Sequence, residues 1–345
     1  MPNWFPFPIA LAFILSAGLT PLVILVAKKF GIVDEPTGGR KIHQISTPLL
    51  GGTAIFVAFF LPVVLVLTFS NHLTAGEIDL TQYAGFFFAG LVLMIGGVLD
   101  DKLNLSPKYS AWFPVLAALI ASVAGIGVSK LTNPLGGAFM VSAAASAIIT
   151  FVWLLIMSYA TKLLDGVDGL TTSVATIGSV MIAALALTKM YFQPDVALLA
   201  LMFAAALLGF LLWNLPAARV FLGEGGSTFL GFTLGVLSII AGSKMVTLLL
   251  VLGVPCLDVV QVIYRRLREK RSITSGDRYH FHHLLFDAGL SERQVVAIYA
   301  GFSLLFGLTT LFFSHLIKLV VLLVLSLLFL AIARTLARAS RKTTS

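Results

Sequence analysis

Apolar segments of membrane-spanning length cover most of this chain. A helix needs about 17–25 mostly apolar residues to cross a bilayer. Only 11% of the residues are charged and 59% are hydrophobic, whereas a soluble domain has roughly 25% charged residues. We therefore expect an all-α integral membrane protein with about eleven transmembrane helices, forming one polytopic domain over residues 1–345. The predicted spans lie near residues 5–27, 50–69, 83–99, 111–129, 141–158, 170–188, 195–213, 226–243, 245–264, 292–313 and 316–336.

The basic residues fall in alternate connecting segments. Of the 23 Lys and Arg residues, all but four lie in odd-numbered loops or at the C-terminus. By the positive-inside rule these segments are cytoplasmic, which predicts an outer N-terminus and a cytoplasmic C-terminus. The net charge of +8 thus reflects topology, so the lipid bilayer is an expected partner and nucleic acid is not. The four exceptions are Lys130, Lys189, Lys244 and Lys318.

Acidic residues gather in the same loops. Asp100 and Asp101 follow the third apolar segment, whereas Asp165 and Asp168 follow the fifth, spaced to share a helical face. Each alone could be a helix cap or a solvated charge. Together, carboxylates at a membrane boundary indicate a wet cavity, and their mutual repulsion calls for a cation. Mg²⁺ suits such oxygen ligands, with Mn²⁺ as an alternative. The loops expected to form this site are 28–49, 99–110, 158–169, 214–227 and 265–292.

Two further motifs add to the predicted site. The turn Gly223-Glu224-Gly225-Gly226-Ser227 opens the eighth apolar segment, and the backbone N–H groups of a helix N-terminus favour anions such as phosphate. His280-Phe281-His282-His283 follows Asp277-Arg278 in the ninth loop. Since cysteine ligands do not accompany them, these histidines fit substrate contact better than zinc. The motifs favour a metal–diphosphate substrate.

Taken in order, these motifs resemble the polyprenyl-phosphate N-acetylhexosamine-1-phosphate transferases. The resemblance runs over nearly the whole chain and also includes Arg40-Lys41-Ile42-His43, Asn214-Leu215-Pro216-Ala217 and Pro255 with Asp258. It implies transfer of a sugar 1-phosphate from a UDP-N-acetylhexosamine to polyprenyl phosphate, with release of UMP, at the start of cell-wall or surface polysaccharide synthesis. The histidine motif is similar to that of the undecaprenyl-phosphate branch that uses UDP-N-acetylglucosamine. A homodimer is left open.

The resemblance also implies roles for individual residues. Asp100 and Asp101 would orient or deprotonate the lipid phosphate, with Asp168 as a third catalytic residue. Glu224 and Asp168 would hold Mg²⁺. The substrate-binding residues would be Lys102, Lys162, Asp165, Asn214, Arg278, His280, His282 and His283.

The chain departs from the family pattern at three positions. Tyr159 and Lys162 stand where relatives usually have Asn, and Glu224 stands where they have Asp. These departures keep open a catalytically silent paralogue. A transporter is a second alternative, although Asp258 is the only acid clearly within a predicted span. The CDP-alcohol phosphotransferases are set aside, because their Asp-Gly motif continues into Ala-Arg and this one continues into Leu170-Thr171.

Overall fold

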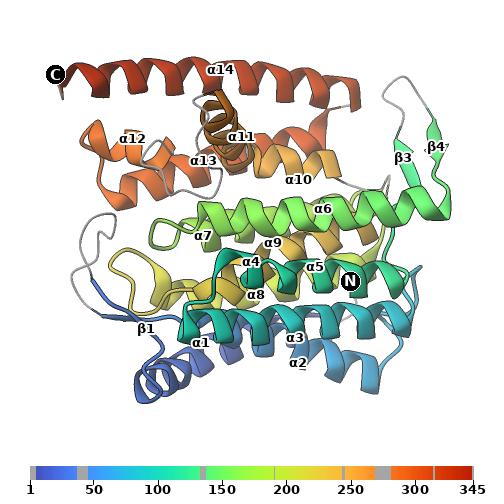
Figure 1. The fold of residues 1–345 in the computed structure, drawn as a ribbon. Helices are drawn as coiled ribbons and strands as arrows, with labels where there is room; N and C mark the ends of the chain where they lie inside the picture. Colours follow the sequence, from blue (N-terminus) through green and yellow to red (C-terminus); the bar gives the residue numbers. More distant parts are fainter. Residues whose placement is uncertain are drawn as a thin grey trace.

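The computed structural model describes residues 5–36, 46–132, 137–189, 191–242, 245–268, 281–313 and 315–343 (Figure 1). The helices are α1 (Pro6–Lys29), α2 (Gly51–Phe69), α3 (Leu80–Leu103), α4 (Pro107–Ser110), α5 (Trp112–Val123), α6 (Ala143–Leu164), α7 (Leu170–Ala186), α8 (Pro194–Asn214), α9 (Gly223–Ile240), α10 (Met245–Val251), α11 (Gly253–Arg268), α12 (Phe281–Asp287), α13 (Glu292–Phe312) and α14 (His315–Thr343). Two small antiparallel pairs accompany them: β1 (Val33–Asp34) with β2 (Thr47–Pro48), and β3 (Lys130–Thr132) with β4 (Ala138–Met140).

Within the described residues, seven helices are long and apolar enough to cross a membrane: α1, α2, α3, α6, α8, α9 and α13. The prediction of an all-α, multi-pass membrane protein is therefore confirmed. The remaining four predicted spans carry α5, α7, the pair α10 and α11, and α14. Helices α5 and α7 are shorter, with 12 and 17 residues, and the ninth predicted span is divided near Leu252 between α10 and α11. The count of eleven stays a prediction.

Local side chains set several helix ends. The Asp79 side chain accepts a hydrogen bond from the Gln82 backbone N–H, and the Gln82 side-chain oxygen accepts one from the Asp79 N–H, so a capping box begins α3. Ser291 and Gln294 form the same motif before α13. Asn104 ends α3 in the left-handed region (φ 49°), which Asn tolerates better than most residues. The first two caps thus begin α3 and α13, and Asn104 ends α3 shortly after Asp100 and Asp101.

Helix α9 lies at the centre of the bundle and packs against α2, α3, α6 and α7. Its side chains are mostly buried. Around it the aromatic rings of α2, α3, α8 and α9 form one cluster with centroid separations of 4.8–6.1 Å, a range typical of favourable aromatic pairs. Trp153 of α6 donates a hydrogen bond to Ser238 of α9 at 3.0 Å. The core of the molecule is thus built around the helix that starts with the glycine turn.

Glycines let α2 and α3 approach α9 at backbone distance. A Cβ on Gly226 would lie 2.8 Å from Gly52 Cα of α2, and a Cβ on Gly225 would lie 3.2 Å from Gly97 Cα of α3. Gly97 is one turn before Asp100 and Asp101. The close contact therefore fixes these two carboxylates beside the first turn of α9.

Candidate active site

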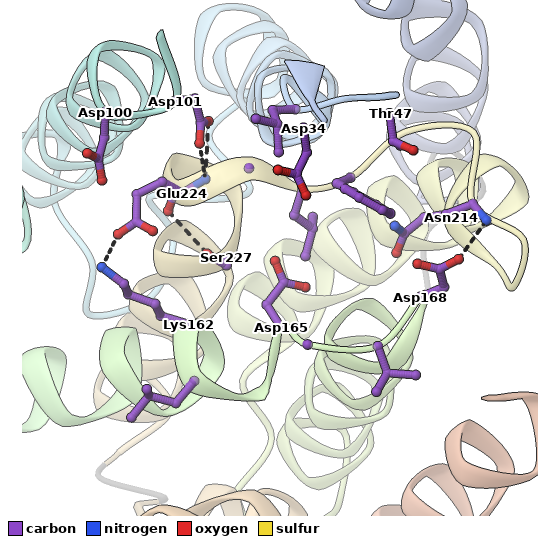
Figure 2. A pocket seen from close by; sticks show the side chains of 18 of the residues that line it. Asp34, Thr47, Asp100, Asp101, Lys162, Asp165, Asp168, Asn214, Glu224 and Ser227 are labelled. Carbon is purple, nitrogen blue, oxygen red and sulfur yellow. Dashed lines mark hydrogen bonds and ion pairs between the residues drawn. The ribbon is translucent and has the colours of Figure 1, made fainter. Parts of the chain in front are cut away.

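A cavity of about 890 Å³ lies where the polar loops meet. All five loops selected from the sequence contribute lining residues to it. Figure 2 shows the labelled carboxylates of the α3 end, the 165–168 segment and the α9 start turned toward a common space. The seven carboxylates that line the cavity are Asp34, Asp100, Asp101, Asp165, Asp168, Glu224 and Glu292.

Asp101 holds the start of α9. The backbone N–H of Glu224 donates to both carboxylate oxygens of Asp101, at 3.1 and 3.2 Å. Gly223, directly before it, has φ +75°, and a Cβ there would meet Asp101 Oδ2 at 2.5 Å. The sequence predicted that this helix N-terminus binds a phosphate. In the structure the Glu224 N–H donates to the carboxyl group of the chain's own Asp101, and Gly225 and Gly226 allow close helix packing.

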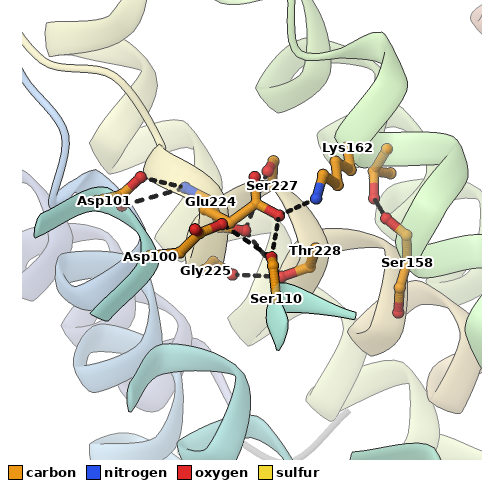
Figure 3. Close-up of polar contacts among 10 residues, drawn as sticks. Asp100, Asp101, Ser110, Ser158, Lys162, Glu224, Gly225, Ser227 and Thr228 are labelled. Carbon is orange, nitrogen blue, oxygen red and sulfur yellow. Dashed lines mark hydrogen bonds and ion pairs between the residues drawn. The ribbon is translucent and has the colours of Figure 1, made fainter. Parts of the chain in front are cut away.

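Asp100 and Glu224 belong to one polar chain, drawn in Figure 3. The Ser110 hydroxyl donates to Asp100 Oδ2 at 2.8 Å and lies 3.5 Å from Glu224 Oε1. The same Oε1 atom forms an ion pair with Lys162 Nζ. The α3 end with the neighbouring α4, and the α6 end more distant in sequence, are thereby joined to the first turn of α9.

Asp165 and Asp168 lie in the loop between α6 and α7 instead of on a helical face. The expectation that helical spacing would align them is therefore wrong, because α6 ends at Leu164. Asp168 Oδ2 accepts a hydrogen bond from the Ala218 backbone N–H at 2.8 Å. In Figure 2, Asp165 lies between Asp168 on one side and Glu224 on the other. Burial, followed by the charges of Glu224 and Asp168, raises the pKa of Asp165 to about 7.

Asn214 borders the cavity but is 4% exposed. Its side-chain oxygen accepts a hydrogen bond from Thr172 at 2.8 Å, and its nitrogen donates to the Val220 carbonyl at 3.0 Å. Both ends of the amide therefore brace the segment that carries Ala218. Its predicted contact with nucleotide stays a prediction, and the role visible here is positioning.

The described part of the histidine motif approaches the Asp165–Gly169 loop. His282 is 3% exposed, and a Cβ on Gly166 would lie 3.1 Å from its Nε2 atom. The α12 start is fixed by Asp258, whose Oδ1 accepts the Phe281 backbone N–H at 2.7 Å. His283 is half-buried on the same short helix.

The other predicted substrate contacts are placed differently. Lys102 lies on the last turn of α3 with an exposed side chain and does not line the cavity. Arg278 and His280 lie outside the described residues.

Sequence reasoning missed Asp34 and Thr47, which line the cavity from β1 and β2. The strand pair places Asp34 opposite Thr47. The second residue of β2 is Pro48, whose carbonyl accepts a hydrogen bond from the Phe221 N–H at 2.8 Å. A two-residue strand carries almost no sequence pattern, so only its acidic residue inside a predicted cytoplasmic loop could have drawn attention to Asp34.

The donor set permits a divalent cation that shares its ligands with substrate. Among the described residues, no group of three or more His, Cys, Asp and Glu side chains is arranged to hold a metal by itself. Mg²⁺, however, is usually held by one or two carboxylates together with substrate phosphates and water. Asp165 and Glu224 are close enough for their charges to raise the pKa of Asp165. The predicted pair Glu224 and Asp168 stays a prediction, and these two residues lie on opposite sides of Asp165 in Figure 2.

Comparison with known proteins now adds to this geometry. Residues 83–242 match the model of glycosyl transferase family 4. The chain is 31% identical over 300 residues to a probable undecaprenyl-phosphate N-acetylglucosaminyl 1-phosphate transferase of Bacillus subtilis, covering 85% of this chain and 80% of that protein. The chain belongs to glycosyl transferase family 4. The resemblance to the polyprenyl-phosphate N-acetylhexosamine-1-phosphate transferases, read from the motifs, is therefore confirmed.

Two further family-4 relatives have the same kind of name. The undecaprenyl-phosphate alpha-N-acetylglucosaminyl 1-phosphate transferase of Escherichia coli K12 is 32% identical over 322 residues, covering 88% of this chain and 83% of its own. The decaprenyl-phosphate N-acetylglucosaminephosphotransferase of Mycobacterium tuberculosis H37Rv is 30% identical over 314 residues, covering 83% of this chain and 77% of that protein. The matched residues 83–242 contain Asp100, Asp101, Asp165, Asp168 and Glu224.

Proposed function

We propose that this protein transfers N-acetylglucosamine 1-phosphate from UDP-N-acetylglucosamine to a polyprenyl phosphate and releases UMP. The observation that carries the proposal is the carboxylate-lined cavity of about 890 Å³, built by five separate loops of a membrane-spanning family-4 chain. The names of its relatives support both the acceptor lipid and the sugar. A cavity of this size accommodates a nucleotide-sized ligand.

In the proposed reaction an oxygen of the lipid phosphate attacks the β-phosphorus of the nucleotide sugar. A new P–O bond forms, the bond between the β-phosphorus and the bridging oxygen breaks, and UMP leaves with that oxygen. A phosphate monoester is already largely ionised near pH 7, so Asp100 and Asp101 need accept only the remaining proton. Positioning and charge stabilisation then supply most of the rate, as in other phosphoryl transfers.

Side chains on the two sides of the cavity have complementary roles in this proposal. Asp165 and Glu224 hold Mg²⁺, or Mn²⁺ in its place, which supplies charge neutralisation to the diphosphate when bound. Asp168 fixes the Ala218 segment on the opposite side. His282 and His283 approach from α12, where hydrogen-bond donors suit the sugar or the diphosphate.

The topology completes the proposal. We infer that eleven spans with an outer N-terminus put every loop of the site on the cytoplasmic side of the inner membrane. The basic residues in odd-numbered loops support this orientation. A homodimer is compatible with it, since much of α1 is exposed on the surface of the bundle.

The test is UMP release by the purified full chain in detergent or nanodiscs. The protein is incubated with Mg²⁺, polyprenyl phosphate and a panel of UDP-sugars, and we expect UMP only where the sugar is an N-acetylhexosamine, with UDP-N-acetylglucosamine fastest. Omission of the lipid phosphate should abolish release. Turnover of none of the UDP-sugars by well-folded protein would favour the silent paralogue instead.

A further inference from the structure

Lys162 is the single basic side chain among the described residues that line the cavity, against seven carboxylates. It projects from the last turn of α6. Lys162 is one of the three residues at which the chain departs from the family pattern. A diphosphate entering such a cavity meets strong negative potential. The position of this one ammonium group therefore matters more than that of any single carboxylate.

The ammonium group of Lys162 is already engaged. Its Nζ atom forms an ion pair with Glu224 Oε1 and lies 5.8 Å from the centroid of the Tyr159 ring. Figure 3 shows Lys162 reaching across to the α9 start to meet this carboxylate. The three residues that depart from the family pattern are thus neighbours in space, with Lys162 between Tyr159 and Glu224. They form one local unit that replaces two amides and a shorter carboxylate.

The pair is open to the cavity. The side chains of Lys162 and Glu224 are 29% and 22% exposed, so neither charge is sealed in the protein interior. A partly exposed ion pair of this kind is weak, at most about 1 kcal/mol, and can exchange partners when a stronger one arrives. A diphosphate carries more negative charge than one carboxylate and forms charge-assisted hydrogen bonds with an ammonium group.

We propose that Lys162 is an internal counter-ion that occupies Glu224 in the substrate-free site and moves to the diphosphate when the nucleotide sugar binds. While the ammonium group remains on Glu224, it repels a divalent cation from that carboxylate. Departure of Lys162 to the diphosphate frees Glu224. Divalent-cation binding is then coupled to nucleotide binding, and by linkage the coupling is reciprocal. This inference rests on the proposed function for the identity of the diphosphate.

The experiment measures Mn²⁺ binding to the full-length protein by the loss of the free Mn²⁺ signal in electron paramagnetic resonance, with and without UDP. Three variants are compared with the wild type. Lys162→Met removes the charge at similar length without adding an oxygen ligand, and Lys162→Arg keeps the charge. Lys108→Met is the matched control, because Lys108 is exposed on α4 outside the cavity lining. Each variant is first checked by size-exclusion chromatography and thermal unfolding.

We expect the UDP-free Lys162→Met protein to bind Mn²⁺ at least about tenfold more tightly than the wild type, within the range usual for coupled sites. Addition of UDP should tighten Mn²⁺ binding in the wild type, in Lys162→Arg and in Lys108→Met, and much less in Lys162→Met. Equal Mn²⁺ affinity of UDP-free wild type and Lys162→Met would overturn the proposal. So would a Lys162→Arg protein that behaves like Lys162→Met, or the lack of Mn²⁺ binding to all proteins under both conditions.

The Mn²⁺ binding experiment does not depend on whether the protein turns over a UDP-sugar. If UMP release fails with every UDP-sugar while Mn²⁺ binding responds to Lys162 and UDP as described, the transferase proposal fails and the counter-ion stands. If UMP is released but Mn²⁺ binding is the same with and without Lys162, the transferase proposal stands and the counter-ion proposal fails.

Discussion

Replacement of Gly226 by Ala tests whether backbone contact between α2 and α9 builds the active site. The added Cβ would lie 2.8 Å from Gly52 Cα and 3.0 Å from Gly52 N, whereas carbon atoms pack at about 3.5–4.0 Å. The two helices must therefore separate by about 0.7 Å, since a backbone cannot rotate away as a side chain can. The Gly52 N–H also donates to the Leu222 carbonyl at 2.9 Å, directly before Gly223.

The cost follows from these contacts. Overpacking a tight interface costs about 1–3 kcal/mol, and a stretched Gly52–Leu222 hydrogen bond adds about 0.5–1.5 kcal/mol. Against this, Ala is favoured over Gly within a helix by about 0.5–1 kcal/mol. The net loss is about 2 kcal/mol, with the α9 start displaced from Asp101.

The assay compares Gly226→Ala with Gly301→Ala. Gly301 lies within α13 and a Cβ there would meet nothing within 4 Å, so the same substitution should leave stability unchanged or slightly raised. We expect Gly226→Ala to lower the apparent melting temperature, followed by tryptophan fluorescence, by a few degrees. UMP release should fall about tenfold or more, because small displacements at a reacting centre are costly. A Gly226→Ala protein with wild-type melting temperature and wild-type turnover would refute the reasoning.

Three more predictions follow from the same contacts. Burial raises the pKa of the metal-free Asp165 to about 7, so its carboxyl group becomes neutral as pH falls through that value and binds a cation less well. Mn²⁺ binding to the full-length protein should therefore weaken when the pH is lowered from about 8 to about 6, and equal affinity at both pH values would contradict this. Asp101→Ala should lower both the melting temperature and turnover, because it removes the hydrogen-bond acceptor at the α9 start, which is worth about 0.5–2 kcal/mol. Asp100→Asn should lower turnover alone. An Asp101→Ala protein with the same melting temperature as Asp100→Asn would contradict the bracing role of Asp101. In a Cys256→Ser background, Asn71→Cys should react with an impermeant thiol reagent on intact cells and Lys108→Cys only after permeabilisation, and the opposite pattern would reverse the topology.

Helix positions and the gathering of the loops could be predicted because they rest on local rules. Apolar length fixes each span, since backbone groups within a bilayer must bond inside the segment, and the charge bias assigns the loops to one side. The α3 start is readable from Asp79 and Gln82 alone. Such signals need no knowledge of which helices are neighbours.

Contacts between distant segments could not be predicted in this way. Asp101 and Glu224 are 123 residues apart, and the local sequence of neither segment predicts the hydrogen bond between them. The glycine turn illustrates the resulting ambiguity: Gly225 and Gly226 fit both a phosphate loop and a close helix crossing. Only the presence of Gly52 and Gly97 opposite them decides for the crossing.

The acidic residues around the cavity divide by what their oxygens contact. Asp101, Asp168 and Asp258 each accept a backbone N–H, from Glu224, Ala218 and Phe281 respectively. Each therefore fixes the start of a segment that borders the site or carries its histidines. Asn at these three positions keeps one oxygen acceptor while it removes the charge.

This division changes how substitutions in the site are read. Loss of turnover in an Asp→Ala variant at a bracing position cannot be assigned to catalysis, because the neighbouring segment is released at the same time. Glu224 differs, since its carboxylate is paired with the side chain of Lys162, and Asp165 is a buried carboxyl group beside the charges of Glu224 and Asp168. The charge that a diphosphate meets on entry thus comes from all seven lining carboxylates and Lys162, while the backbone bonds of Asp101 and Asp168 also determine where the neighbouring segments lie.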